Sequence, residues 1–230
     1  MRSLIAGNGE IGKALFEVLY PFYQTELIDP PKGLFPPPNQ YDILHVCFPY
    51  SMAFVAEVKK LQQEYQPKYT VIHSTVPVGT SRECDALHSP VIGLHPFLKE
   101  GIKTFTKFIG GARGSEVADY FRRAGLKVYL CQQTETTELA KVAQTTAYAL
   151  MVEYTKDVQR QCDKFGVPFA EAWTLFTHNY NEGYSTLGYD EFKLPVLVPI
   201  MKPQGGHCTI PNLEFWRTRF TDFIKAMNQL

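Results

Sequence analysis

The opening of the chain alternates apolar and polar positions in a pattern that predicts a strand, a turn, a helix and a second strand. Residues 3–6 form a short apolar run that leads into Gly7-Asn8-Gly9-Glu10-Ile11-Gly12. A second short run, residues 26–28, ends at Asp29. Between the two runs, apolar residues recur at the spacing of an amphipathic helix: Ile11, Ala14, Leu15, Val18 and Leu19.

Strand-like and helix-like patterns continue to alternate up to about residue 133. Residues 52–65 and 115–124 have helical spacing, whereas five prolines between residues 30 and 38 predict a loop. This alternation is typical of a doubly wound, mostly parallel sheet, so we predict a Rossmann-type α/β domain over residues 1–133. The further strand-like runs are residues 43–48, 70–73, 91–94, 108–109 and 127–130.

The pattern changes at residue 134. Residues 134–165 contain neither proline nor glycine, and their apolar positions form one helical stripe. Such a helix would be about 48 Å long, too long for a crossover in a small sheet. We therefore predict a smaller all-helical region over residues 134–230, with further helices near 168–178 and 213–227 and a stretch rich in tyrosine and proline between them.

Composition and charge exclude several classes of protein. Hydrophobic residues make up 45% of the 230 residues, which is enough for a buried core. Twenty-three basic residues balance 23 acidic ones, so we expect no nucleic-acid partner. No apolar run approaches the ~20 residues of a membrane-spanning helix. Because the first strand pattern starts almost at Met1, we expect no cleavable signal peptide.

The cysteines and histidines are not spaced as metal ligands or as a disulfide framework. The five cysteines are odd in number and lack CxxC spacing, which favours a reducing, cytoplasmic location. No metal-ligand spacing connects the six histidines, so we predict no metal site. The cysteines are Cys47, Cys84, Cys131, Cys162 and Cys208.

The glycine turn has the context of a dinucleotide-binding motif, since a strand precedes it and a helix follows. Gly7 would make the tight turn, Gly9 would let a pyrophosphate approach, and Gly12 would let the helix lie close to the sheet. The N-terminus of the helix would supply N–H groups and partial positive charge to the phosphates. The alternative is a glycine-rich turn that binds no ligand.

Asp29 indicates which dinucleotide is bound. A carboxylate at this position can accept hydrogen bonds from the adenosine ribose and would repel a 2′-phosphate, so we predict NAD rather than NADP, with Lys32 nearby as the feature that argues the other way. The predicted cofactor-binding residues are Gly7, Asn8, Gly9, Glu10, Ile11, Gly12, Asp29, Phe48, Pro49, Ser74 and Thr75.

Three later segments carry a family resemblance. They are Ser74-Thr75-Val76-Pro77-Val78-Gly79-Thr80, Glu138-Leu139-Ala140-Lys141 and Gly205-Gly206-His207-Cys208. In this order behind the glycine turn, they resemble the UDP-glucose/GDP-mannose dehydrogenase family, including its UDP-N-acetylmannosamine dehydrogenase branch. The resemblance implies a helical region like that of 6-phosphogluconate dehydrogenase. Family members continue into a further domain that holds much of the nucleotide sugar, and we expect this chain to be a truncated relative without it.

The resemblance also implies a chemistry, an NAD-dependent oxidation of an alcohol. Cys208 matches the family nucleophile, which attacks the aldehyde formed in the first oxidation. Lys141 matches the lysine that stabilises the developing oxyanion or alkoxide. Thr75 matches a threonine whose hydroxyl can hold a water or the substrate oxygen. The substrate class implied is a sugar or sugar nucleotide.

Three departures from the family pattern limit this expectation. The family's NPEFLxEG segment corresponds here to residues 95–101, HPFLKEG, without a carboxylate between proline and phenylalanine. Thr145 replaces an asparagine, and Asn212 replaces an aspartate. We therefore favour a single two-electron step over the full four-electron oxidation. A dinucleotide-binding protein without catalytic turnover is the alternative from another functional class.

A second resemblance gives His95 a role. Gly93-Leu94-His95-Pro96-Phe97 is similar to a segment of prephenate and arogenate dehydrogenases. In that interpretation His95 is the general base that removes a hydroxyl proton, and Cys208 is incidental. The structural alternative is that His95 ends a strand and hydrogen-bonds to the backbone.

The helical region also predicts self-association. A long helix commonly buries an exposed stripe against a second copy, so we predict a homodimer formed through residues 134–165. The aromatic residues near Gly183 and Gly188 would line a substrate loop, a dimer interface or an ordinary packed cluster. They are Tyr180, Tyr184, Tyr189 and Phe192.

Overall fold

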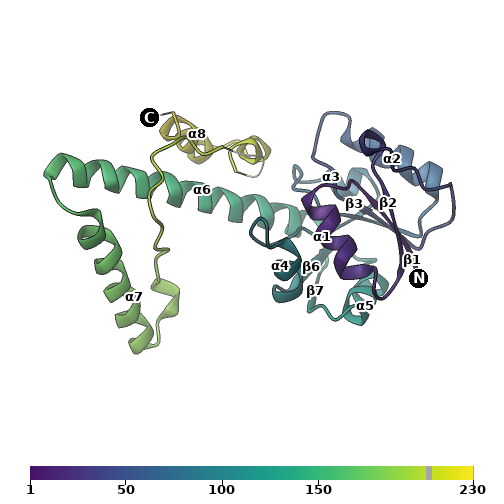
Figure 1. The fold of residues 1–230 in the computed structure, drawn as a ribbon, viewed down its shortest axis with the longest axis horizontal. Helices are drawn as coiled ribbons and strands as arrows, with labels where there is room; N and C mark the ends of the chain where they lie inside the picture. Colours follow the sequence, from purple (N-terminus) through teal and green to yellow (C-terminus); the bar gives the residue numbers. More distant parts are fainter. Residues whose placement is uncertain (206–208, 230) are drawn as a thin grey trace. The chain divides into compact units, whose positions relative to one another are not determined.

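The computed structural model describes residues 1–205 and 209–229. Its contacts divide the chain into two compact units, Met1–Val142 and Ala143–Leu230 (Figure 1), called here the N-terminal and C-terminal units. The long helix α6, Thr134–Phe165, starts in the first unit and continues into the second. The helix begins at Thr134, where we predicted the helical region to begin, whereas the contacts divide the chain between Val142 and Ala143.

The N-terminal unit is built on a seven-stranded sheet with the order β2-β1-β3-β4-β5-β6-β7. Neighbouring strands are parallel except for β5 and β6, which are antiparallel. The strands are β1 Arg2–Ala6, β2 Gln24–Ile28, β3 Ile43–Val46, β4 Tyr69–Ile72, β5 Leu87–His88, β6 Lys107–Gly110 and β7 Val128–Cys131. The sheet, together with helices in the residues described, confirms the predicted α/β class with a helical region.

Helices cover both faces of this sheet. Successive strand residues point to opposite sides, so neighbouring residues on one strand pack against different helices. Ile5 packs in one cluster with residues of α1, α4 and α5, whereas its neighbour Leu4 packs in the other with residues of α2. These helices are α1 Glu10–Leu19, α2 Phe54–Tyr65, α4 Leu98–Thr104 and α5 Ser115–Arg123, and the one-turn α3 spans Thr80–Glu83. Both faces of the central strands are therefore buried.

The predicted strand at residues 91–94 is wrong. The strand in that part of the chain is β5, Leu87–His88, and Pro90, which has no N–H to donate to a sheet ladder, follows it. Two residues give no alternating pattern, and His88 is a polar residue that the fold buries completely. The apolar run instead forms the loop that leads to α4.

A chain of buried polar side chains lies between the sheet and α5. His45 Nδ1 is 3.0 Å from His73 Nε2, and His45 Nε2 is 3.3 Å from the hydroxyl of Tyr120. Lys107 Nζ lies 3.3 Å from His73 Nδ1 and donates to the carbonyl of Ser89 at 3.1 Å. Burial lowers the pKa of His45 to about 3 and that of Lys107 to about 7. These histidines are therefore uncharged in the folded protein. Near neutral pH, Lys107 is also uncharged in a large share of the folded molecules.

The C-terminal unit, as far as the structure describes it, is helical. After α6 come the π-helical segment η2, Ala170–Leu175, the helix α7, Phe176–Leu187, and the short 3₁₀ turns η3 and η4, Asp190–Phe192 and Pro211–Phe215. The last helix, α8, is Arg219–Met227. Three fully buried apolar residues of the C-terminal unit form a small cluster: Ala149, Leu213 and Ile224. Within the described residues, no helix has the length and apolar character needed to cross a bilayer.

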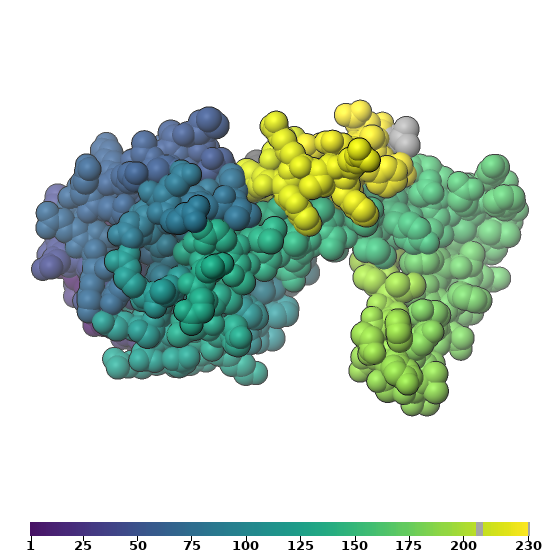
Figure 2. All heavy atoms as spheres, turned by 180° about the vertical axis from the view of Figure 1, so that it is seen from behind, coloured from purple at the N-terminus to yellow at the C-terminus, as the bar shows by residue number. Residues whose placement is uncertain are grey.

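The helix α7 extends further than the sequence predicted. It includes Tyr180 and Tyr184, which the sequence placed in an irregular stretch. Asn181 holds the following segment to α7, because its side-chain amide donates to the carbonyl of Leu194 and accepts from the N–H of the same residue. The ring of Phe192 also packs on Tyr184. These residues form one lobe of packed atoms, light green in Figure 2.

Candidate functional site

The glycine turn places the N-terminus of α1 against the end of β1. Gly7 has φ +98°, and a Cβ on Gly12 would lie 1.8 Å from the carbonyl oxygen of Gly7, so only glycine fits at either position. A Cβ on Gly9 would meet nothing within 4 Å. Gly9 is also the N-cap of α1 and supplies no capping side chain. The turn thus leaves an open approach to a helix N-terminus, which is suited to a phosphate group.

Asp29, at the end of β2, is held beside this turn. Its Oδ2 atom accepts a 2.7 Å hydrogen bond from the backbone N–H of Asn8 and lies 3.3 Å from Lys32 Nζ. Lys32 also donates to the carbonyl of Asn8. The carboxylate and the turn are therefore one connected unit, with a cation bound to both.

The loops after β3 and β4 reach the same edge of the sheet, because β1, β3 and β4 are parallel neighbours. The Ser74 hydroxyl donates to the carbonyl of Phe48 at 2.5 Å, and a Cβ on Gly7 would lie 3.0 Å from the nitrogen of Phe48. Ser74 is buried and links the two loops, whereas Thr75 is half-buried and Pro49 is exposed. The structure thus brings these predicted cofactor residues to one edge.

Glu138 ties the segment after β4 to the long helix. Its side chain is fully buried and accepts hydrogen bonds from the backbone N–H groups of Gly79 at 2.6 Å and Ser81 at 2.8 Å. One turn further along α6, the ammonium of Lys141 donates to the carbonyl of Val91 at 3.0 Å. From the sequence we assigned no role to Glu138 itself. Its position in the Glu138-Leu139-Ala140-Lys141 segment was the signal that could have indicated one.

His95 contacts the glycine turn directly. Its Nδ1 atom pairs with the carboxylate of Glu10, the first residue of α1. Both side chains remain largely exposed to solvent. From the sequence we assigned separate roles to His95 and Glu10 and did not predict that they meet. The imidazole therefore lies where the turn opens, at the end of the loop that begins at Val91.

The predicted nucleophile Cys208 lies outside the described residues, together with Gly206 and His207. Two of the departures from the family pattern lie in the C-terminal unit, Thr145 on α6 and Asn212 in η4. The thiols of Cys47 and Cys84 are buried, and burial raises their pKa to about 12 and about 11. Neither of these two is suited to act as a thiolate nucleophile.

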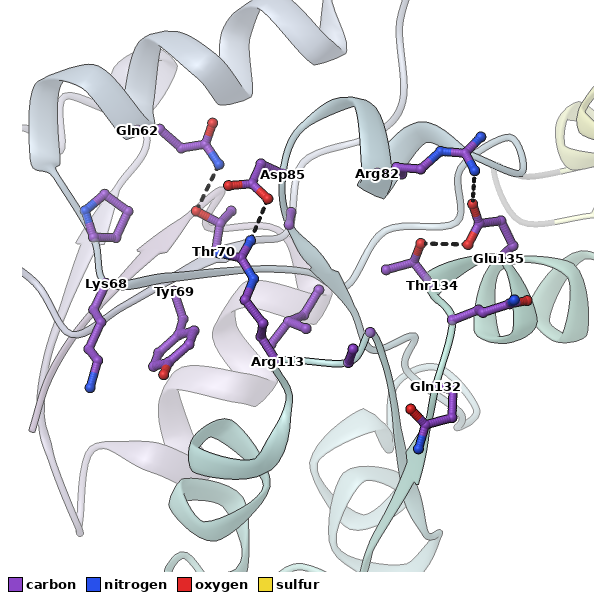
Figure 3. Close-up of a pocket in the computed structure, with 16 residues that line it drawn as sticks. Gln62, Lys68, Tyr69, Thr70, Arg82, Asp85, Arg113, Gln132, Thr134 and Glu135 are labelled. Atoms are coloured by element: carbon purple, nitrogen blue, oxygen red, sulfur yellow. Dashed lines mark hydrogen bonds and ion pairs between the residues drawn. The ribbon is translucent and has the colours of Figure 1, made fainter.

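A large cavity lies at the opposite edge of the sheet, and Figure 3 shows the residues that line it. It has a volume of about 820 Å³ and is lined by the amino end of β4, by the residues after β6 and by the start of α6. Arg82 pairs with Glu135 at 2.8 Å, and Arg113 pairs with Asp85, so four charges in the cavity wall are neutralised in pairs. This cavity does not belong to the glycine-turn site. Among residues 1–205 and 209–229, no three His, Cys, Asp or Glu side chains are grouped as metal ligands.

Solved structures share this fold, although no model of a known protein family and no curated protein matches the sequence. The UDP-D-ManNAc dehydrogenase from Pyrococcus horikoshii aligns with 100% of this chain and 68% of its own, with 13% identity and a TM-score of 0.74. The native UDP-N-acetyl-mannosamine dehydrogenase from Staphylococcus aureus covers the same shares, with 12% identity and a TM-score of 0.73.

A third similar structure is matched over more of its length. The 3-hydroxyisobutyrate dehydrogenase from Mycobacterium tuberculosis aligns with 99% of this chain and 92% of its own, with 14% identity and a TM-score of 0.73. At these identities the comparisons establish a fold like that of dehydrogenases. They do not assign an activity or a substrate to this chain.

Proposed function

We propose that the protein is an NAD-dependent oxidoreductase that transfers a hydride from an alcohol carbon, of a sugar or sugar nucleotide, to the nicotinamide ring. The observation that carries this proposal is the turn itself. The space beside Gly9 is open, the N-terminus of α1 has no side-chain cap, and the Asp29 carboxylate is bound to the same turn. These are the features that a pyrophosphate and an adenosine ribose require of a βαβ unit.

The residues of the N-terminal unit would bind the cofactor along one edge of the sheet. The N–H groups at the start of α1 would hold the pyrophosphate, Asp29 would accept from the ribose, and the loops at Phe48 and Ser74 would line the path beyond it. When bound, NAD supplies the hydride acceptor. The residue types fit this role, since the site offers backbone donors, one carboxylate and small side chains.

Lys141 would stabilise the negative charge that develops on the substrate oxygen. Its ammonium is fixed on the carbonyl of Val91, and a positioned cation stabilises an alkoxide most where water is scarce. Thr75 would hold the substrate oxygen or a water. Cys208 would serve a thioester route only if a second oxidation followed. Because the family carboxylate is absent from residues 95–101 and Asn212 replaces an aspartate, we propose a single two-electron step.

A second candidate is an enzyme in which His95 is the base. The pairing of His95 with Glu10 favours it, since the carboxylate orients the imidazole at the mouth of the turn. Replacement of His95 by Gln separates the two enzymes, because it would abolish turnover that depends on His95 and barely change turnover that depends on Lys141. Replacement of Cys208 by Ser would abolish only a thioester path. The candidate that is not an enzyme is a dinucleotide-binding protein without turnover. The absence of the family carboxylate from residues 95–101 and the replacement of an aspartate by Asn212 support it.

Two measurements test the proposal. The fluorescence of NADH, titrated with the full chain, reports binding, and the absorbance of reduced nicotinamide during incubation with NAD and candidate alcohols reports turnover. Saturable binding with turnover supports the enzyme. Binding without turnover on any sugar, sugar nucleotide or hydroxy acid favours the non-catalytic protein, and no binding removes all three candidates.

We also propose a homodimer formed through α6. Three large side chains on the part of this helix in the C-terminal unit are exposed in the single chain: Tyr148 at 57%, Tyr154 at 49% and Phe165 at 71%. Aromatic residues are enriched at interfaces between subunits. Light scattering should give twice the 26.2 kDa mass of the chain, and Tyr148→Lys should reduce it to that of the monomer. A monomeric wild-type protein would overturn the proposal.

A further inference from the structure

A short rigid turn carries Lys32 back to the dinucleotide-binding motif. Residues Pro30–Lys32 form the 3₁₀ turn η1, in which two prolines fix the backbone, and Gly33 ends it with φ +70°. The N–H of Lys32 donates to the carbonyl of Asp29 at 2.8 Å. Asp29 and Leu34 exchange two backbone hydrogen bonds of 3.1 and 3.2 Å, which close the turn. The position of Lys32 is therefore set by the backbone before any ligand binds.

The side chain of Lys32 neutralises the group expected to exclude NADP. Its ammonium is 3.3 Å from Asp29 Oδ2 and donates to the carbonyl of Asn8. The same carboxylate oxygen accepts from the N–H of Asn8. A carboxylate rejects a 2′-phosphate mainly by charge repulsion, and this repulsion is weakened when a cation is already bound to the carboxylate. The lysine side chain is 48% exposed, so it can turn toward a phosphate at little cost.

We propose, resting on the dinucleotide site of the proposed function, that Lys32 is the residue that determines cofactor choice and that the site accepts NADP(H) as well as NAD(H). The ammonium would bind the 2′-phosphate as a point charge when NADP is present. Asp29 would accept from the ribose hydroxyls when NAD is present, while Lys32 stays on the carbonyl of Asn8. The prediction of NAD from Asp29 is thereby extended to both cofactors.

The experiment compares two fragments that differ only in the 2′-phosphate. Isothermal titration of the full chain with 5′-ADP and with 2′,5′-ADP measures the adenosine end of the site without the nicotinamide ring. Wild-type protein should bind the two within about tenfold of each other, and Lys32→Gln should weaken 2′,5′-ADP by about tenfold while 5′-ADP changes less than about threefold. Lys99→Gln is the matched control, since Lys99 is also ion-paired on the surface of the N-terminal unit, with Glu17 at 2.9 Å.

A second variant tests the carboxylate. Asp29→Asn removes the charge that Lys32 neutralises, so it should weaken 5′-ADP and leave 2′,5′-ADP unchanged or tighter. The inference is overturned if wild-type protein binds 5′-ADP but 2′,5′-ADP more than about a hundredfold more weakly, or if Lys32→Gln weakens both fragments equally. In those cases the proposed function still stands. If neither fragment nor either whole dinucleotide binds, the proposed function fails, and the inference fails with it.

Discussion

The carboxylate of Glu138 accepts a 2.6 Å hydrogen bond from the backbone N–H of Gly79, so the segment after β4 is fastened to the first turns of α6. The second carboxylate oxygen accepts from Ser81. Two backbone donors at the start of a short helix are thereby satisfied by one buried anion, which lies where the positive end of that helix favours negative charge.

Replacement of Glu138 by Gln should destabilise the N-terminal unit. The amide keeps one acceptor and turns its NH₂ group toward the other backbone N–H, which leaves a buried donor without a partner. We expect the free energy of unfolding in urea to fall by about 1–3 kcal/mol. Glu135→Gln is the control, because Glu135 pairs with an exposed arginine and should cost less than about 1 kcal/mol. Equal losses in both variants would contradict the role given to Glu138.

Replacement of Gly9 by Val should abolish dinucleotide binding without unfolding the protein. The new side chain meets no protein atom within 4 Å of its Cβ, yet it occupies the space through which the pyrophosphate would approach. NADH fluorescence should show at least about a hundredfold weaker binding, with an unchanged melting temperature. Gly183→Val is the control, since Gly183 on α7 is equally open. Undiminished binding to the Gly9 variant would place the dinucleotide elsewhere.

Replacement of Gly12 by Ala, unlike replacement of Gly9 by Val, should reduce the stability of the protein. Its Cβ would lie 1.8 Å from the carbonyl oxygen of Gly7, so α1 must move away from the sheet. We expect a loss of about 2–4 kcal/mol in the free energy of unfolding, measured in urea. A fully stable variant would mean that the close approach of helix and turn is not required.

Stability should rise with pH between about 7 and 10 because of Lys107. Burial lowers its pKa in the folded state to about 7 from 10.5, so the unfolded chain binds a proton in this window that the folded chain does not. The free-energy cost of burying the charged ammonium of Lys107 is fully present below pH 7. It disappears above the pKa of this lysine in the unfolded chain. His45, with its pKa lowered to about 3, adds a loss of stability as the pH falls below 6.5.

Lys107→Met should therefore stabilise the protein at pH 6, by roughly 2–4 kcal/mol in urea unfolding, and the gain should shrink toward pH 10. The carbonyl of Ser89 keeps a partner in the variant, because it also lies 2.7 Å from His73 Nδ1. Lys103→Met, an exposed position on α4, should show no such pH dependence. A gain that does not vary with pH would contradict the explanation by charge burial.

Replacement of Lys141 by Gln should reduce turnover more than binding. The proposed role of the ammonium is to stabilise charge that exists only in the transition state, so kcat should fall by about 10²–10³ while NADH affinity changes little. Steady-state kinetics and the fluorescence titration together measure both. A change in affinity alone would make Lys141 a structural residue that supports the loop at Val91.

Local sequence signals predicted much of this fold. The glycine turn, with its strand and helix, depends on neighbouring residues, and α6 ends where the stretch without proline or glycine ends, directly before Gly166. The two-residue strand β5 depends instead on pairing with β4 and β6, which are distant in sequence, and its buried His88 obscured the pattern.

The contacts within the site were harder to predict. Glu138 with Gly79, His95 with Glu10 and Lys32 with Asn8 each join segments whose distance is decided by the sheet order. Single residues in a sequence do not encode that order. Motif positions predicted roles for Lys141 and Asp29, but not which partners would hold them.

The reversal between β5 and β6 has a consequence for engineering. Because β5 runs with β4 and β6 runs against it, the chain leaves β5 and enters β6 at the same edge of the sheet as the glycine turn. The segment from Ser89 to Thr106, with His95 and α4, is an excursion from that edge. Residues 93–97 of this excursion are exposed, whereas Val91, Leu98 and Ile102 belong to the buried core. The exposed residues can therefore be lengthened, shortened or exchanged without altering how the five parallel strands pair, which makes them the natural position for redesigning what the protein accepts.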